Sequence, residues 1–186
     1  MRIISGNFKG KKIYQPLDKK TRPLRDMVKE SIFNLLIHSN KLNFEIKKSN
    51  ILDLFSGSGS FGLECASRGA NKVIFVENYF NILSILKKNV GLVDSENICE
   101  IIEQDCFKYF KINTYSKNKF NLIFIDPPYK ENKINFLIDE IKKNNILDHK
   151  GIIIIHRHKK DNTKISEKLK IIDQRTYGIS KIIIGN

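Results

Sequence analysis

The order of apolar and polar positions divides most of the chain into short strands that alternate with helices. Runs rich in β-branched and aromatic residues predict strands at 51–55, 72–77, 98–104, 120–126 and 151–156. Helical spacing between them predicts helices near 60–68, 80–90, 105–110 and 132–143. Because crossover helices must pack on the sheet that they connect, this alternation predicts a mostly parallel sheet covered on both faces, the doubly wound Rossmann-like α/β fold class.

The two ends of the chain depart from this alternation. Near the carboxyl end, β-rich runs at 168–173 and 179–185 have no helix between them, which predicts a closing antiparallel hairpin. Near the amino end, residues 2–14 predict two short strands around the turn SGNFKG, and apolar residues recur at helical spacing up to about Ile37. We therefore predict a small hairpin and helix extension at 1–40, followed by one α/β domain at 41–186.

The proportions of hydrophobic and charged residues are those of an ordinary soluble protein, but basic residues are in excess. The 186 residues include 33 Lys plus Arg against 20 Asp plus Glu, a formal net charge of +13. Such an excess is expected of a protein that meets a polyanion, although the abundance of Lys, Asn and Ile offers a background explanation for part of it. No apolar run approaches the roughly twenty residues of a membrane span, and no secretory signal is visible, so we expect a cytoplasmic protein with no membrane partner. The three cysteines show no C-x-x-C pairing, which argues against a metal site.

A glycine-rich stretch, DLFSGSGSFGLE, follows the first strand of the α/β domain. Gly57, Gly59 and Gly62 have the G-x-G-x-x-G spacing of a dinucleotide site, but many adenosine-containing cofactors satisfy such a turn. Asp53 stands four residues before Gly57, where its carboxylate can face a ligand ammonium. S-adenosylmethionine has that ammonium and no phosphates, whereas NAD has two phosphates and no primary amine. The stretch therefore favours S-adenosylmethionine.

Acidic residues follow three consecutive predicted strands, at Asp53, Glu77 and Asp105. Open α/β sheets bind ligands beyond the carboxyl ends of their strands. Glu77 stands about twenty residues after Gly57, the spacing at which a carboxylate accepts from ribose hydroxyls. Asp105 is positioned to accept from an adenine amine. Any one of them alone is equally well explained as a solvated strand-end carboxylate.

The stretch LIFIDPPYK places Asp126, Pro127, Pro128 and Tyr129 directly after the fourth strand. Two prolines fix the backbone and remove two N–H donors, so the turn presents carbonyl oxygens and a carboxylate. The Asp126 carboxylate and the Pro127 carbonyl can hold an exocyclic base amine, free its lone pair and aim it at a methyl group. Tyr129 offers a flat face on which the base can stack. These four residues are the predicted catalytic site.

Taken together, these motifs resemble the bacterial small-subunit ribosomal RNA guanine-N2 methyltransferases. The resemblance rests on DPPY, the glycine-rich stretch, Glu77, the opening MRIISGNFKGKK with TRPLRDMVKESIFNLL, and the ending YGISKIIIG. It implies a seven-stranded sheet with an antiparallel last strand, S-adenosylmethionine as methyl donor and a guanine N2 amine as acceptor. It also implies cofactor contacts from Asp53, Phe55, Gly57 and Gly59 at the methionine end, Glu77 at the ribose, Asp105 with Cys106 at the adenine, and Asp126 at the reacting groups.

Basic residues crowd the amino-terminal 25 positions, ahead of the predicted catalytic domain. We predict that this segment contacts RNA phosphates through Arg2, Lys9, Lys11, Lys12, Arg22 and Arg25. A second basic stretch, HRHKK at 156–160, is either a solvated cluster at a strand end or an extension of the RNA surface. The expected partner is ribosomal RNA within a small-subunit assembly particle, bound by a monomer.

Three other functions stay open on the sequence. A DPPY methyltransferase that acts on adenine N6 or cytosine N4 in DNA would use the same cofactor logic, but the short chain lacks an obvious target-recognition domain. An NAD-dependent oxidoreductase would explain the glycines and Glu77 while leaving DPPY unused. A non-catalytic RNA-binding module would have no cofactor and no use for Asp126.

Overall fold

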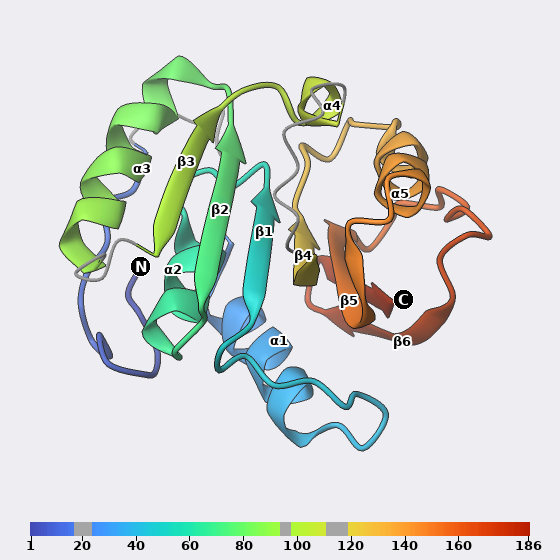
Figure 1. The fold of residues 1–186 in the computed structure, drawn as a ribbon, viewed down its shortest axis with the longest axis horizontal. Helices are drawn as coiled ribbons and strands as arrows, with labels where there is room; N and C mark the ends of the chain where they lie inside the picture. Colours follow the sequence, from blue (N-terminus) through green and yellow to red (C-terminus); the bar gives the residue numbers. More distant parts are fainter. Residues whose placement is uncertain (17–23, 94–97, 111–118) are drawn as a thin grey trace.

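The computed structural model describes residues 1–16, 24–93, 98–110 and 119–186. The helices are α1 (Asp26–His38), α2 (Ser60–Ser67), α3 (Phe80–Val93), α4 (Cys106–Tyr109) and α5 (Ile134–Lys143). The strands are β1 (Asn50–Leu54), β2 (Lys72–Glu77), β3 (Cys99–Glu103), β4 (Phe120–Ile125), β5 (Leu147–His158), β6 (Ile171–Tyr177) and β7 (Ser180–Gly185). Figure 1 shows α3 and α5 flanking the sheet from opposite sides.

The strands form one seven-stranded sheet in the order β3-β2-β1-β4-β5-β7-β6. Strands β1 to β5 pair in parallel, and β7 runs antiparallel to both β5 and β6. This arrangement confirms the predicted fold class, including the antiparallel last strand. The carboxyl ends of β1, β2, β4 and β5 therefore lie at one edge of the sheet, where ligands of such folds bind.

Strand β5 begins earlier than the sequence indicates. It starts at Leu147, and the register with β4 shifts between Phe120 and Leu122. The intervening residues DHKG are polar, so the apolar run from Gly151 onward hides the earlier start. Gly151 is required there because a Cβ would come within 2.9 Å of both Leu147 and the Phe120 carbonyl oxygen.

Side chains alternate between two apolar clusters, one on each face of the sheet. In β1, Ile51 faces the cluster that includes α1 and α2 residues, whereas Leu52 and Leu54 face the cluster built with α4 and α5. Burial on both faces explains why the central strands are almost continuously apolar. Among the helices of the described ranges, none is both long and apolar enough to cross a lipid bilayer.

The amino-terminal segment forms a turn closed by one isolated bridge between Arg2 and Lys12, in place of the two strands that the sequence predicts. Its backbone is anchored to α2, because Glu64 accepts hydrogen bonds from the amides of Ile4 (2.7 Å) and Ser5 (2.9 Å). Lys29 of α1 is fully buried, lies 3.8 Å from Glu64 and donates to the Arg2 carbonyl at 2.8 Å. A buried lysine is stable only with such partners. The extension thus packs firmly on the domain that follows it.

Candidate functional site

A cavity of about 500 Å³ lies at the carboxyl ends of the parallel strands. Five carboxylates line it, from Asp53, Glu77, Asp105, Asp126 and Glu131. No lysine or arginine stands among the described residues that line it, although the whole chain carries +13. The cavity is therefore suited to a ligand that carries positive charge.

Most of the predicted site residues meet in this cavity. Its lining includes Asp53, Phe55, Gly57, Glu77, Asp105, Asp126, Pro127, Pro128 and Tyr129, and does not include Gly59 or Cys106. The sequence analysis missed four aromatic lining residues, Phe61, Tyr79, Phe107 and Phe124. Tyr79 and Phe107 each stand two positions after an acidic strand-end residue, a regular spacing that was available as a signal.

Asp53 lines the cavity and binds the first turn of α2. Its Oδ2 accepts from the amide of Gly62 at 3.0 Å, and the side chain is almost fully buried. Burial is the main cause that raises the pKa of Asp53 well above its usual value; the Gly62 hydrogen bond opposes it, and the nearby Asp126 and Glu77 add to it. A bound cation would favour the ionised form of this carboxyl.

Gly59 allows the backbone of the glycine-rich stretch to turn into α2. It is the N-cap of α2 with φ of 81°, a left-handed backbone conformation, and a Cβ there would lie 2.6 Å from Leu86. Gly57 also has a positive φ, and its amide donates to Oε2 of Glu77 at 2.8 Å. The glycine-rich stretch is thus tied to the end of β2 by a charge-assisted hydrogen bond.

Glu77 accepts two further backbone hydrogen bonds. The amides of Asn78 and Tyr79 both donate to its Oε1 at 2.9 Å. The carboxylate therefore orders the loop after β2 as well as the glycine-rich stretch, and Oε2 has remaining capacity for a ligand hydroxyl.

Asp105 and Cys106, which the resemblance places together at the adenine, have different positions in the structure: Asp105 lines the cavity and Cys106 does not. Asp105 is the N-cap of α4, accepting from the amides of Phe107 at 2.8 Å and Lys108 at 3.2 Å, while its Oδ2 accepts from Asn78 at 3.3 Å. The Cys106 thiol is buried beneath the loop and accepts from the Phe55 amide at 3.2 Å. Burial raises the pKa of this thiol well above its usual value, so the sulfur is a packed, protonated group.

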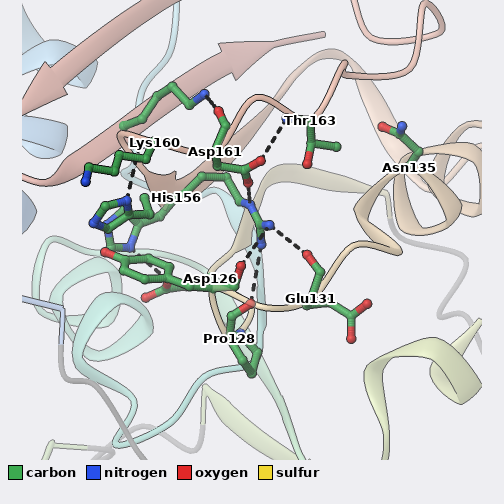
Figure 2. A network of polar contacts seen from close by, with 12 residues as sticks. Asp126, Pro128, Glu131, Asn135, His156, Lys160, Asp161 and Thr163 are labelled. Carbon is green, nitrogen blue, oxygen red and sulfur yellow. Dashed lines mark hydrogen bonds and ion pairs between the residues drawn. The ribbon is translucent and has the colours of Figure 1, made fainter.

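The DPPY turn is held against β5. Asp126 Oδ1 lies 2.8 Å from Nδ1 of His156, and the Asp126 amide donates to the Leu54 carbonyl at 3.3 Å. The Tyr129 ring packs edge-on against two histidine rings, with centroid distances of 6.2 Å to His156 and 4.9 Å to His158. Figure 2 shows Asp126 and His156 side by side in this polar network.

Arg157 lies under the same turn and fixes its backbone. Its guanidinium donates to the carbonyls of Glu131 at 2.7 Å and of Pro128 and Tyr129 at 3.4 Å each, and its Nε pairs with Asp161 (Figure 2). Burial acts to raise the pKa of Asp161, but hydrogen bonds from Thr163 and Arg157 outweigh it and bring that pKa to about 2. The ion pair therefore persists across the physiological pH range.

These contacts correct the interpretation of HRHKK. His156 and Arg157 are 4% and 3% exposed, so neither belongs to a solvated cluster, and His156 lines the acidic cavity instead. They are the last buried positions of β5, on which the DPPY turn rests. Only Lys159 and Lys160 of this stretch are exposed.

Of the predicted RNA-contacting residues, Arg2, Lys9, Lys11, Lys12 and Arg25 are exposed, and Arg22 lies outside the described residues. The Lys11 ammonium donates to the Leu92 carbonyl near the end of α3 at 2.5 Å and lies 5.3 Å from the Phe8 ring centroid. Arg25 borders a second cavity beside the first.

We expect the double change Lys9→Ala and Lys12→Ala to weaken RNA binding and to reduce its salt dependence by up to about two units of log–log slope, one for each phosphate that a lysine no longer neutralises. Cofactor affinity should stay at the parental value. The matched control replaces Lys119 and Lys150, two exposed lysines near the amino ends of β4 and β5. Parental RNA affinity at every salt concentration would show that Lys9 and Lys12 do not contact the RNA.

Asp53→Asn should stabilise the protein without ligand while weakening cofactor binding. Asn keeps an acceptor for Gly62 but carries no buried charge. Because the folded-state pKa is raised, the parent loses stability as pH rises above the unfolded value of about 4, and the variant does not. The free energies of unfolding should therefore agree near pH 4, and that of the Asn variant should be higher at pH 8. Equal stability at pH 8 would contradict this assignment.

Comparison with known proteins places the chain in a family. The model of the Conserved hypothetical protein 95 family matches residues 1–186. A ribosomal RNA small subunit methyltransferase D from Haemophilus influenzae is 32% identical over 180 residues, 96% of this chain and 90% of that protein. A crystal structure from the same organism, 30% identical, has a TM-score of 0.78 over 100% of this chain and 97% of that one.

A more distant solved structure is complexed with SAH. It has a TM-score of 0.63 at 17% identity, covering 82% of this chain and 49% of that one, so the likeness shows the fold alone. The match over the whole length confirms the resemblance that the motifs predict. The chain therefore belongs to the Conserved hypothetical protein 95 family, together with the ribosomal RNA small subunit methyltransferases D that its motifs resemble.

Proposed function

We propose that this protein transfers a methyl group from S-adenosylmethionine to the exocyclic N2 amine of a guanine in small-subunit ribosomal RNA. The observation that carries the proposal is the acidic cavity that contains the DPPY turn within a chain of net charge +13. A cationic cofactor suits the carboxylates, and a polyanionic substrate suits the basic exterior. The relatives named ribosomal RNA small subunit methyltransferase D support the choice of RNA.

The residues of the cavity fit the parts of this cofactor in order. Asp53 serves the methionine ammonium, Glu77 the ribose hydroxyls and Asp105 the adenine amine, all from the edge of one sheet. About 500 Å³ is within the usual range of small-molecule sites. When bound, S-adenosylmethionine supplies an electrophilic methyl group on a positively charged sulfur.

Asp126 prepares the amine for attack. With Oδ1 engaged by His156, Oδ2 remains to accept from the guanine N2 amine. Holding one N–H in this way turns the nitrogen lone pair out of the ring plane and toward the methyl group, and the carboxylate receives the proton that the nitrogen loses. Tyr129 stacks on the base, a contact worth about 1–3 kcal/mol.

The NAD-dependent alternative fits these residues poorly. In a dinucleotide site, the free amides at the helix N-terminus bind the pyrophosphate. Here Asp53 already accepts from the Gly62 amide in the first turn of α2, and its carboxylate would repel phosphate. A phosphate-bearing cofactor is therefore disfavoured on electrostatic grounds.

The test incubates the protein with labelled S-adenosylmethionine and one of three substrates: deproteinised ribosomal RNA, small subunits from a strain that lacks the enzyme, or DNA. We expect label on the N2 amine of one guanine, located by mapping the modified base. Preference for the subunit would support an assembly particle as the substrate. Label on adenine N6 or cytosine N4 of DNA, or cofactor binding without transfer to any RNA, would overturn the proposal.

A further inference from the structure

A second cavity, of about 450 Å³, lies beside the acidic cavity, and the methyl transfer proposed above makes no use of it. Two side chains, Leu24 and His156, line both cavities. The other walls of the second cavity include Gln15 from the amino-terminal segment, Arg25 and Asp26 at the start of α1, and the first residue of β7. Several separate parts of the chain therefore form a hollow next to the place proposed for the target base.

The two cavities differ in charge. The acidic cavity has five carboxylates and, among the described residues that line it, no lysine or arginine. The second cavity has one arginine, Arg25, and one carboxylate, Asp26, among its described lining residues. An RNA strand whose guanine enters the acidic cavity must keep its phosphates outside, because the carboxylates repel them. A strand that continues past Leu24 and His156 instead meets Arg25, which is exposed.

Asp26 gives the second cavity a hydrogen-bond acceptor. Its Oδ1 is buried and lies 3.8 Å from the buried Lys29 ammonium. The side chain as a whole is nevertheless 46% exposed, so Oδ2 is the oxygen left for a ligand. Within the described ranges, Lys29 is the one partner of this carboxylate. Because a carboxylate accepts hydrogen bonds and does not donate them, a ligand at Oδ2 must bring a donor.

We propose that the second cavity binds the base of the nucleotide next to the target guanine, and that Asp26 selects a base with an exocyclic amine. This inference rests on the proposed function. Adenine, cytosine and guanine each carry an amine that can donate to Oδ2. Uracil has a carbonyl oxygen where cytosine has its amine, and the carboxylate would repel that oxygen. Arg25 then binds the phosphate that joins the two nucleotides.

The other lining residues also suit a base. Leu24 is buried and apolar, so it offers a surface on which the flat ring can pack. Gln15 is exposed, and its amide can both donate to and accept from the edge of a base. A volume of about 450 Å³ is within the usual range of small-molecule sites.

The test changes the nucleotide on each side of the guanine, one at a time, in the RNA or small subunit that the parent methylates. On one side, an abasic residue should lower kcat/KM by about tenfold or more, because hydrogen bonds to a charged group are lost. On that same side, cytosine should be preferred over uracil by about tenfold. The two pyrimidines have nearly the same size, so their comparison isolates the amine.

Three variants assign the preference to the second cavity. Asp26→Asn should remove most of the preference for cytosine, because its amide can also donate to the uracil carbonyl. The matched control is Glu30→Gln, which changes an exposed carboxylate one turn further along α1 that does not line the cavity and should keep the parental preference. Gln15→Ala serves if Asp26→Asn does not fold: it should slow methylation beside cytosine but not beside an abasic residue. Calorimetric cofactor affinity checks that each variant is folded.

The outcomes separate the two proposals. If the parent methylates no guanine N2 in the unaltered substrate, the proposed function fails. If the parent methylates guanine N2 equally well beside every base and beside an abasic residue on both sides, the inference is overturned while the proposed function stands. The same holds if the preference exists but Asp26→Asn and Gln15→Ala leave it at the parental value, because the neighbouring base is then bound elsewhere.

Discussion

Replacing Asp126 by alanine should slow single-turnover methyl transfer by more than a hundredfold while S-adenosylmethionine still binds. The change removes the acceptor that holds the amine and the negative charge that stabilises positive charge on the nitrogen as the methyl group arrives. Electrostatic contributions of this kind are typically worth about 2.7–4 kcal/mol. It also leaves Nδ1 of His156 without its partner, so the turn should lose some order as well.

Asp126→Asn keeps the turn in place but removes the charge. Its amide oxygen can still accept from His156, so the turn should keep its position, and transfer should slow by roughly a hundredfold or more, because the side chain loses both its charge and the oxygen that would accept from the guanine amine. The matched control is Glu131→Gln, which removes a carboxylate from the same cavity but not from the DPPY turn and should slow transfer less than about tenfold. Near-parental methyl transfer by the alanine variant would show that Asp126 is not the residue that holds and polarises the amine.

The fold could be predicted from the sequence because its determinants are local. Strands buried on both faces show as continuous apolar runs, and the helix between each pair forces a parallel crossover. The first residues of β5, at 147–150, do not form such an apolar run. Asp148, His149 and Lys150 are polar and partly or fully exposed, although they extend the strand. Local patterns cannot reveal a strand whose outer residues face water.

The acidic half of the site was also predictable, since carboxylates that follow parallel strands must meet at one sheet edge. The residues of β5 that hold the DPPY turn could not be predicted in the same way. His156 and Arg157 are charged or polar residues in a basic stretch, and only their pairing with Asp126 and with the carbonyls of the DPPY turn makes their burial favourable. Such pairing joins positions about thirty residues apart, and a single sequence carries no signal of it.

The role of Cys106 shows the same limit. Its neighbour Asp105 follows a strand and faces the cavity, and the family resemblance implied that both residues contact the adenine. In the structure, Asp105 caps α4 through its side chain, and the following residue turns its thiol inward to the Phe55 amide. Whether a residue beside a cap faces ligand or core depends on the helix direction, which tertiary packing decides.

Glu77→Ala should weaken S-adenosylmethionine binding at least tenfold, because two ribose hydroxyls lose a charged acceptor worth about 1.5–3 kcal/mol. The structure adds a second cause. Glu77 also accepts from the amides of Gly57, Asn78 and Tyr79, so the alanine variant should loosen both loops that frame the cavity. Calorimetric titration measures the total loss, and thermal denaturation without cofactor measures the part due to the loops.

A cofactor analogue separates ribose recognition from loop order. The parent should bind S-adenosylmethionine about tenfold more tightly than an analogue that lacks a ribose hydroxyl, and Glu77→Ala should bind the two alike, because its acceptor is gone. Glu103→Ala is the matched control: Glu103 pairs with Glu77 in register at the end of β3, but it is exposed, forms an ion pair with Lys87 and does not line the cavity. It should retain the parental preference for the hydroxyl. If Glu77→Ala still distinguishes the two ligands as the parent does, the ribose is held by another residue, and Glu77 acts only through the loops that it orders.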